Sequence, residues 1–149
     1  MSVRYLNSGE LRRREFLGLC ACVAAGSVLG ACASVLVRQV PVSNGRMELP
    51  LVQYPELSHA GAALQILPEG ETQPLIVIVD ADGKHSVISS ECTHKGCTVE
   101  VQGERIVCPC HGSTYDRKGE VLKGPAQRSL RRYPSRLTSE GVLIIELAS

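Results

Sequence analysis

The chain has 149 residues, which suffice for one domain and are too few for two domains of ordinary size. Hydrophobic residues make up 44% and charged residues 21% of the sequence, a composition that excludes disorder along the whole chain. A formal net charge of +1 without a basic block, together with an aromatic content of only 3%, argues against nucleic acid as a partner. Seven cysteines and four histidines are many for this length, and they indicate bound metal, a disulfide or both.

The first 37 residues have the composition of a targeting segment. An uncharged run extends from Phe16 to Val37, and four of the sixteen basic residues precede it. A basic segment followed by an apolar stretch and a polar domain is typical of an export signal. The run is also long enough to cross a bilayer as one helix, which takes about 20 apolar residues. We therefore predict one N-terminal apolar helix that serves as a signal or membrane anchor within residues 1–37.

The start of this run resembles the twin-arginine export signal, in which two arginines are followed by one residue and then Phe-Leu. Arg13 and Arg14 supply the pair and the motif continues to Leu17, with Arg12 where Ser or Thr is usual. That route exports proteins already folded, so the resemblance implies a domain that takes up its cofactor before export. It would then lie on the periplasmic or outer face of the membrane.

The end of the run carries a second processing signal. Residues 29–32, Leu-Gly-Ala-Cys, resemble a bacterial lipobox in which Cys32 is lipidated. Ala31-Cys32-Ala33 also fits an ordinary cleavage site. The sequence leaves three alternatives: an uncut anchor, a lipoprotein attached through Cys32, or a cleaved soluble domain.

Beyond the anchor, the pattern changes twice. Residues 38–50 contain two prolines, an Asn-Gly pair and little periodicity, so we interpret them as a linker. Residues 51–149 contain short apolar or alternating runs separated by turn signals such as Asp82-Gly83, which is typical of an antiparallel all-β sandwich or barrel. The expected strands are 62–67, 75–80, 85–89, 98–101, 105–107, 120–122 and 142–147.

Two short boxes carry the chemistry. Residues 92–97 read Cys-Thr-His-Lys-Gly-Cys, and residues 108–113 read Cys-Pro-Cys-His-Gly-Ser. An alternating stretch with a turn near Gln102-Gly103 joins them, and a hairpin of this length brings both boxes to one tip. Two cysteines and two histidines from the boxes fit a tetrahedral zinc site. The Cys-x-His spacing and the two further cysteines argue against zinc. The alternative is a [2Fe–2S] cluster with two thiolates on one iron and two imidazoles on the other.

Together, the boxes resemble the two cluster-binding boxes of Rieske iron–sulfur proteins, and most closely the high-potential type of cytochrome bc complexes. The resemblance implies an antiparallel Rieske sandwich or barrel with a small cluster-binding subdomain, covering residues 51–149. It also implies one [2Fe–2S] cluster, with Cys92 and Cys108 on the buried iron and His94 and His111 on the outer iron.

Further residues match the family outside its metal ligands. The resemblance pairs Cys97 with Cys110 in a disulfide. Ser113 and Tyr115 match the family's Ser-x-Tyr, whose hydroxyls donate hydrogen bonds to cluster sulfurs. The proline loop that covers the cluster in the family is resembled by Gly124, Pro125 and Ala126.

Two positions depart from the family pattern. Lys95 replaces the leucine that borders the quinol in quinol-oxidising complexes, and Gln127 replaces a frequent proline. The resemblance implies an iron–sulfur subunit of a quinol–cytochrome c oxidoreductase, with cytochrome b and a c-type cytochrome as partners. Lys95 and the short chain favour a stand-alone periplasmic carrier, or the small subunit of a periplasmic oxidoreductase such as arsenite oxidase. A zinc-binding adaptor without a redox role is the third alternative.

Other charged and titratable residues have simpler interpretations. Two histidines far from any cysteine, His59 and His85, are expected to be surface or structural residues. A basic cluster follows the proline loop and is interpreted as a solvated face, with a docking face for an acidic partner as the alternative. Its members are Arg128, Arg131, Arg132 and Arg136.

Overall fold

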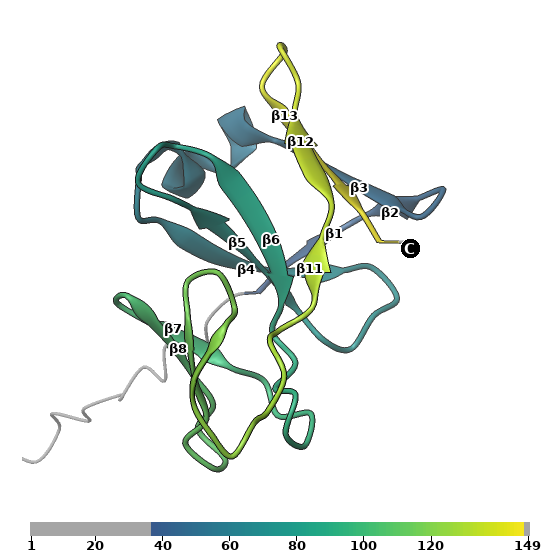
Figure 1. Ribbon diagram of the computed structural model, residues 1–149. Helices are drawn as coiled ribbons and strands as arrows, with labels where there is room; N and C mark the ends of the chain where they lie inside the picture. Colours follow the sequence, from purple (N-terminus) through teal and green to yellow (C-terminus); the bar gives the residue numbers. More distant parts are fainter. Residues whose placement is uncertain (1–36, 148–149) are drawn as a thin grey trace, which may run out of the picture. The chain divides into compact units, whose positions relative to one another are not determined.

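The computed structural model describes residues 37–147, and the regular secondary structure in this range is almost entirely β-strand (Figure 1). The all-β prediction is confirmed within this range. The predicted apolar helix, Arg13, Arg14 and Cys32 lie outside the described residues. Within the described residues, no helix is long and apolar enough to cross a membrane.

Two sheets form the base of the domain. The larger has the strand order β1-β4-β5-β6-β11, in which only the β1–β4 pair is parallel, and the smaller is antiparallel with the order β12-β13-β3-β2. The larger sheet consists of β1 (Arg38–Val40), β4 (Ala63–Pro68), β5 (Leu75–Val79), β6 (His85–Ser89) and β11 (Arg132–Tyr133). The smaller consists of β2 (Val42–Ser43), β3 (Arg46–Pro50), β12 (Ser135–Leu137) and β13 (Val142–Glu146).

A third sheet forms a separate subdomain inserted between β6 and β11. It is antiparallel with the order β10-β9-β8-β7, and it carries both predicted boxes on its connections. Its strands are β7 (Glu100–Gln102), β8 (Arg105–Val107), β9 (Thr114–Asp116) and β10 (Val121–Lys123). The expected cluster-binding subdomain is therefore present as a compact four-stranded unit.

The prediction of a linker at residues 38–50 is wrong. These residues form β1, β2 and β3, and β3 pairs with β13 along its whole length. Met47 and Leu49 are fully buried, because β3 alternates polar and apolar residues with the period of a strand. Asn44 and Gly45 both have positive φ, 52° and 71°, so the pair forms the tight hairpin turn between β2 and β3. The strands on either side of this turn are short, so in the sequence the Asn-Gly pair and the prolines dominate and resemble a linker.

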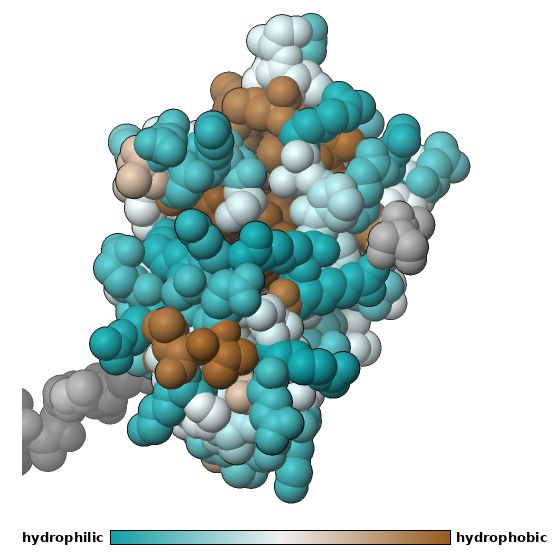
Figure 2. Space-filling model, in the orientation of Figure 1, coloured by the Kyte–Doolittle hydropathy of each residue, from teal (hydrophilic) through white to brown (hydrophobic). Residues whose placement is uncertain are grey.

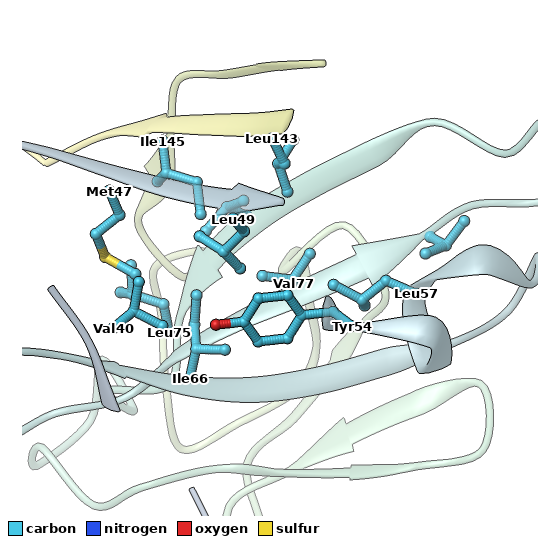
Figure 3. Packing of buried hydrophobic residues seen from close by; sticks show 12 residues of the cluster. Val40, Met47, Leu49, Tyr54, Leu57, Ile66, Leu75, Val77, Leu143 and Ile145 are labelled. Atoms are coloured by element: carbon cyan, nitrogen blue, oxygen red, sulfur yellow. The ribbon is translucent and has the colours of Figure 1, made fainter. Parts of the chain in front are cut away.

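One strand serves two hydrophobic cores. Alternate residues of β5 point to opposite faces, so Leu75, Val77 and Val79 enter the base core, which Figure 3 shows between the two base sheets. On the other face, Ile76 and Ile78 enter the core of the inserted subdomain. All five residues of β5 are buried as a result.

Two short 3₁₀ helices, which the sequence did not predict, close one side of the base core. They are η1 (Leu51–Gln53) and η2 (Pro55–Ser58). Tyr54 lies between them and Leu57 lies within η2, and both side chains are buried in the base core (Figure 3).

Candidate metal centre

Each predicted box forms a loop closed by the same pair of backbone hydrogen bonds. In the first, the Cys92 N–H donates to the Cys97 carbonyl and the Gly96 N–H donates to the Cys92 carbonyl, both at 2.8 Å. In the second, the Cys108 N–H donates to the Ser113 carbonyl at 2.8 Å and the Gly112 N–H to the Cys108 carbonyl at 3.0 Å.

The fifth position of each loop is a glycine with positive φ. The values are +76° at Gly96 and +74° at Gly112. This left-handed conformation is strained for any residue with a Cβ atom, so glycine is required to close each loop. We call residues 92–97 and 108–113 the first and second ligand loops.

A disulfide joins the two ligand loops. Cys97 and Cys110 are bonded, with their Cα atoms 6.5 Å apart, so the predicted pairing is confirmed. The sulfur of Cys108 lies within 4.8 Å of both disulfide sulfurs. The bond therefore lies directly against one of the predicted ligand thiols, and its own two sulfurs are not available as thiolates.

Two free thiols and two imidazoles remain in the loops. Cys92 and Cys108 are buried, with exposed fractions of 2% and 1%. His94 is half-buried and His111 is exposed, and their ring centroids lie 4.8 Å apart in an edge-to-face arrangement. Each loop thus contributes one thiol on the inner side and one imidazole nearer the solvent.

The His94 ring has an unsatisfied atom. Its Nδ1 is buried and has no hydrogen-bond partner within the part of the chain that the structure describes. An unpartnered buried nitrogen is costly, whereas a metal ion satisfies an imidazole nitrogen directly. Two buried thiols beside two imidazoles, one with a free ring nitrogen, therefore fit the sulfur and nitrogen ligation of a Rieske cluster.

The two thiols have different proton affinities. Burial would raise the pKa of Cys92, but hydrogen bonds from Tyr115, the His94 backbone, Cys108 and Ser113 outweigh it and lower that pKa overall. Burial raises the pKa of Cys108, and its contact with Cys92 raises it further. Hydrogen bonding therefore favours the thiolate form of Cys92, and burial disfavours that of Cys108.

Tyr115 connects β9 to the first ligand loop. Its hydroxyl oxygen lies 3.3 Å from the Cys92 sulfur and accepts a hydrogen bond of 3.3 Å from the Thr93 N–H. The side chain is fully buried, and burial raises the Tyr115 pKa. The hydroxyl therefore keeps its proton at neutral pH and can donate it toward the sulfur.

The predicted proline loop is tied to both ligand loops. The Ala126 N–H donates to the Ser113 hydroxyl oxygen at 3.0 Å. The Thr93 hydroxyl donates to the Arg128 carbonyl at 2.6 Å. Ala126 is 4% exposed and packs in the same core as Cys92 and Cys108, so the loop covers the thiols as expected.

The arginines of the basic cluster that the sequence suggested have different local contacts. Arg132 pairs with Glu120, and Arg131 lies over the Tyr133 ring. Only Arg128 and Arg131 line the hollow of about 360 Å³ beside the first ligand loop. All four arginines of the cluster are exposed, as expected for a solvated face.

The two remaining histidines lie outside the site. The ring of His85 bonds the Leu57 carbonyl at 3.0 Å, which confirms a structural role, and His59 is exposed at the end of η2.

Sequence reasoning missed two polar residues that position the site. Thr93 links Tyr115 to Arg128, as described above. Arg117 donates to the carbonyls of Gly103, Gly61 and Ala62, and so joins the inserted subdomain to the base. Neither has a local signal, because their partners are carbonyls distant in sequence.

Comparisons with known proteins agree with this arrangement. The sequence profile of the Rieske [2Fe-2S] domain matches residues 50–134. A cytochrome b6-f complex iron-sulfur subunit of Prochlorococcus marinus is 32% identical over 151 residues, covering 91% of this chain and 85% of that protein. Iron-sulfur subunit 1 of the Cyanophora paradoxa cyanelle is 38% identical over 80 residues, 52% of this chain and 34% of that protein.

A solved structure agrees as well. The plasma membrane Rieske protein PetC3 of Synechocystis PCC 6803 is 29% identical, with a TM-score of 0.50, over 64% of this chain and 91% of that chain. The fold and the site define a small β-domain with two thiols and two imidazoles on two joined loops. The chain belongs to the Rieske [2Fe-2S] domain family and binds one [2Fe–2S] cluster. Family membership decides between the two metals that the boxes allowed, and the zinc alternative is wrong.

Proposed function

We propose that this chain transfers single electrons as the iron–sulfur subunit of a membrane-bound quinol–cytochrome c oxidoreductase, with cytochrome b and a c-type cytochrome as partners. The relatives named cytochrome b6-f complex iron-sulfur subunits support this proposal, because one of them aligns over 91% of the chain. In this proposal Cys92 and Cys108 hold the inner iron, and His94 and His111 hold the outer iron. The bound cluster supplies a one-electron couple within the Rieske range of about −150 to +300 mV.

The observation that carries the proposal is the pairing of two buried thiols with two imidazoles that lie closer to solvent. Cys92 and Cys108 are shielded by the proline loop and the disulfide, so water has little access to the sulfur side. His111 is exposed, and its ring offers an edge at the surface that a partner can contact. A second imidazole nitrogen at that edge can accept a proton and a hydrogen bond from quinol.

The hydroxyls beside Cys92 adjust the affinity for an electron. The Tyr115 hydroxyl lies 3.3 Å from this sulfur, and hydrogen bonding with Tyr115 and Ser113 lowers the Cys92 pKa. Because an added electron makes the sulfur environment more negative, these donors stabilise the reduced form more than the oxidised form. They therefore favour a potential in the upper part of the Rieske range.

The test of this proposal is spectroscopic and stoichiometric. The purified, dithionite-reduced protein should give the electron-spin spectrum of one Rieske cluster and should take up one electron per chain in a redox titration. Solubilised membranes should yield the protein together with cytochrome b. A protein purified with zinc alone, or without any spin signal after reduction, contradicts the proposal.

Export and anchoring form part of the same proposal, supported by Arg13, Arg14 and the uncharged run that follows. Changing both arginines to lysine keeps the charge and should stop translocation of the loaded protein. A general positive-inside anchor would tolerate this change. If the double variant is found in the periplasm with its cluster, the twin-arginine route is contradicted.

A second candidate is a stand-alone periplasmic carrier, or the small subunit of a periplasmic oxidoreductase such as arsenite oxidase. One observation favours it: the position next to His94 is an exposed lysine rather than an apolar residue. Purification distinguishes the two candidates, because a stand-alone carrier would be extracted from the membrane fraction without bound cytochrome b.

A further inference from the structure

The face of the domain around His94 carries two exposed cations. Lys95 follows His94 in the first ligand loop, and its side chain makes no ion pair with any described residue. Arg128 is also exposed and has no ion-pair partner among residues 37–147. Its side chain and His94 line the same hollow, of about 500 Å³. We call Lys95 and Arg128 the tip cations.

These unpaired cations do not reflect a general excess of positive charge. Residues 38–149 contain twelve basic and thirteen acidic side chains, a net charge of −1. Elsewhere among the described residues, three arginines pair with carboxylates and a fourth donates to carbonyls. The examples are Arg38 with Glu56, Arg46 with Glu146, Arg132 with Glu120, and Arg117 with three carbonyls.

The opposing charge at the tip is small. Glu91 lines the hollow that Arg128 and Arg131 share with the first ligand loop, and no other carboxylate among the described residues lines it. The second ligand loop contains no charged side chain. The Arg128 backbone is fixed against the first loop by the 2.6 Å hydrogen bond from Thr93. The tip is therefore a positive surface with one arginine anchored beside His94.

The tip lacks the features of a small-anion pocket. Such a site needs buried donors that converge on the ligand, but the nearby donors are used internally. The Thr93 N–H and hydroxyl bond Tyr115 and Arg128, and the Ala126 N–H bonds Ser113. The tip cations are exposed at the rim instead, which is where charge steers and orients a large partner.

The part of the tip around Lys95 and Arg128 also has no exposed large hydrophobic side chain among the described residues. The exposed large hydrophobic side chains within the described residues are Val52, Leu122 and Leu137, and none lies in a ligand loop or in residues 124–128. On the face shown in Figure 2, the lowest part, where the ligand loops of Figure 1 lie, is mainly hydrophilic, and a hydrophobic patch lies directly above it.

We propose that the tip docks an acidic protein surface that surrounds the partner's redox group, with Lys95 and Arg128 facing its carboxylates. The inference rests on the proposed electron-transfer function and names its partner class. One electron leaves this chain in each encounter and the partner's redox group gains it, with no bond made or broken. Charge complementarity of this kind raises the association rate and fixes the orientation of the complex.

The first test does not depend on electron transfer. The loaded protein is mixed with a decaglutamate peptide and a carbodiimide, which joins lysine amines to carboxylates, and linked lysines are mapped by mass spectrometry. Lys84 is the matched control, because it is exposed, has no ion pair with the described residues and precedes the opposite end of β6 from Cys92. We expect Lys95 to be linked about fivefold more than Lys84 at low salt. Equal linking would overturn the proposal.

The second test measures the sign of the surface charge at the tip, with the anion ferricyanide as the oxidant. Each ferricyanide ion takes one electron from one reduced, loaded protein, and stopped-flow absorbance gives the rate constant. At about 10 mM ionic strength, Lys95→Glu and Arg128→Glu should each slow this reaction about tenfold, and Lys84→Glu should leave it nearly unchanged. Wild-type rates should fall as salt is added. Rate constants that do not depend on salt concentration, or that change equally in all three variants, would overturn the proposal.

The two proposals fail differently. A chain that shows no Rieske spin signal after reduction refutes the proposed function, and no ferricyanide reduction would then be observed. A chain with a normal spin signal, equal linking at Lys95 and Lys84, and faster reduction of Lys95→Leu by a short-chain quinol refutes only the acidic partner. That result would assign the tip to quinol.

Discussion

The two ligand loops share a backbone but differ in what they expose. Both are closed by the same two hydrogen bonds and the same left-handed glycine. The first loop places its histidine two residues after the cysteine, carries Lys95 and is bonded through Thr93 to the proline loop. The second places its histidine three residues after the cysteine, exposes the ring of His111 and has no charged side chain.

This difference shows how one loop design can serve two purposes. The closed backbone fixes the two cysteines at equivalent inner positions, while the histidine spacing decides how far each ring reaches toward solvent. The first loop supplies charge and anchoring, and the second supplies an uncharged exposed edge. The following predictions either break this equivalence or measure it.

The largest effect is expected from the ligands. Single changes of Cys92 or Cys108 to Ser, or of His94 or His111 to Ala, should abolish the visible and electron-spin spectra, because each iron would lose one of its two protein ligands. The two loops should be equally sensitive.

The matched controls for the ligand variants are His59→Ala and His85→Ala. Both should retain the spectrum, although His85→Ala loses its bond to the Leu57 carbonyl and should unfold more easily. A spectrum that persists without one of the four ligands would show that the assignment is wrong.

The next effect concerns the bond between the loops. Cys97→Ser and Cys110→Ser break the same disulfide, and closing a loop of this length is worth roughly 3 kcal/mol in the chain-entropy model. Each variant should lower the free energy of unfolding of the loaded protein by this amount and should lose the cluster more readily.

Denaturant titration followed by absorbance measures the disulfide effect. The two variants should agree within experimental error, and a large difference would mean that one cysteine has a second role. Two free thiols at positions 97 and 110 in the native protein, detected by mass spectrometry, would contradict the disulfide itself.

A smaller effect is expected at the two loop glycines. Gly96→Ala and Gly112→Ala should each cost roughly 1–2 kcal/mol of unfolding free energy, because alanine is strained at these positive φ values. A Cβ at Gly112 meets nothing within 4 Å, and at Gly96 only the flexible Glu91 side chain at 3.4 Å. Backbone strain therefore dominates both.

Gly70→Ala is the control for the loop glycines, since φ is +86° there and the space is open. It should show a similar loss of stability with an unchanged cluster spectrum. A change in only one ligand loop would show that their closures are not equivalent.

The smallest effect is on the potential. Hydrogen bonds to charged acceptors are worth about 1.5–3 kcal/mol, of which we expect about 1–2 kcal/mol to differ between redox states. Tyr115→Phe and Ser113→Ala should therefore each lower the midpoint potential by roughly 45–90 mV. Protein-film voltammetry measures this shift, with Tyr54→Phe in the base core as the control. An unmoved midpoint in both variants would show that these hydroxyls do not reach the redox centre.

Sequence alone predicted most of the chemistry and about half of the architecture. The spacing within the boxes indicated which cysteines and histidines meet, and the structure brings Cys92, Cys108, His94 and His111 to one tip. Their ligation of iron stays a prediction. Strands β6 and β8 have the predicted bounds, because their apolar pattern is local.

What sequence could not supply depends on distant partners. Strands β9, β11 and β12 have only two or three residues, and they exist because β8, β6 and β13 offer matching edges. Thr93 and Arg117 position the site through carbonyls that only the fold brings near. The error at residues 38–50 has another origin, since the alternation of β3 is present in the sequence but covers only five residues between a turn and Pro50.

Strand β5 has a consequence for how the protein opens. Because its alternate residues belong to both cores, the inserted subdomain cannot detach without exposing apolar surface of the base. Both ends of the domain therefore open as one cooperative unit, and the amide protons of β5 should be among the slowest to exchange with solvent. The inserted subdomain and the base therefore unfold together. Loss of the cofactor should lower the free energy of unfolding of the whole domain.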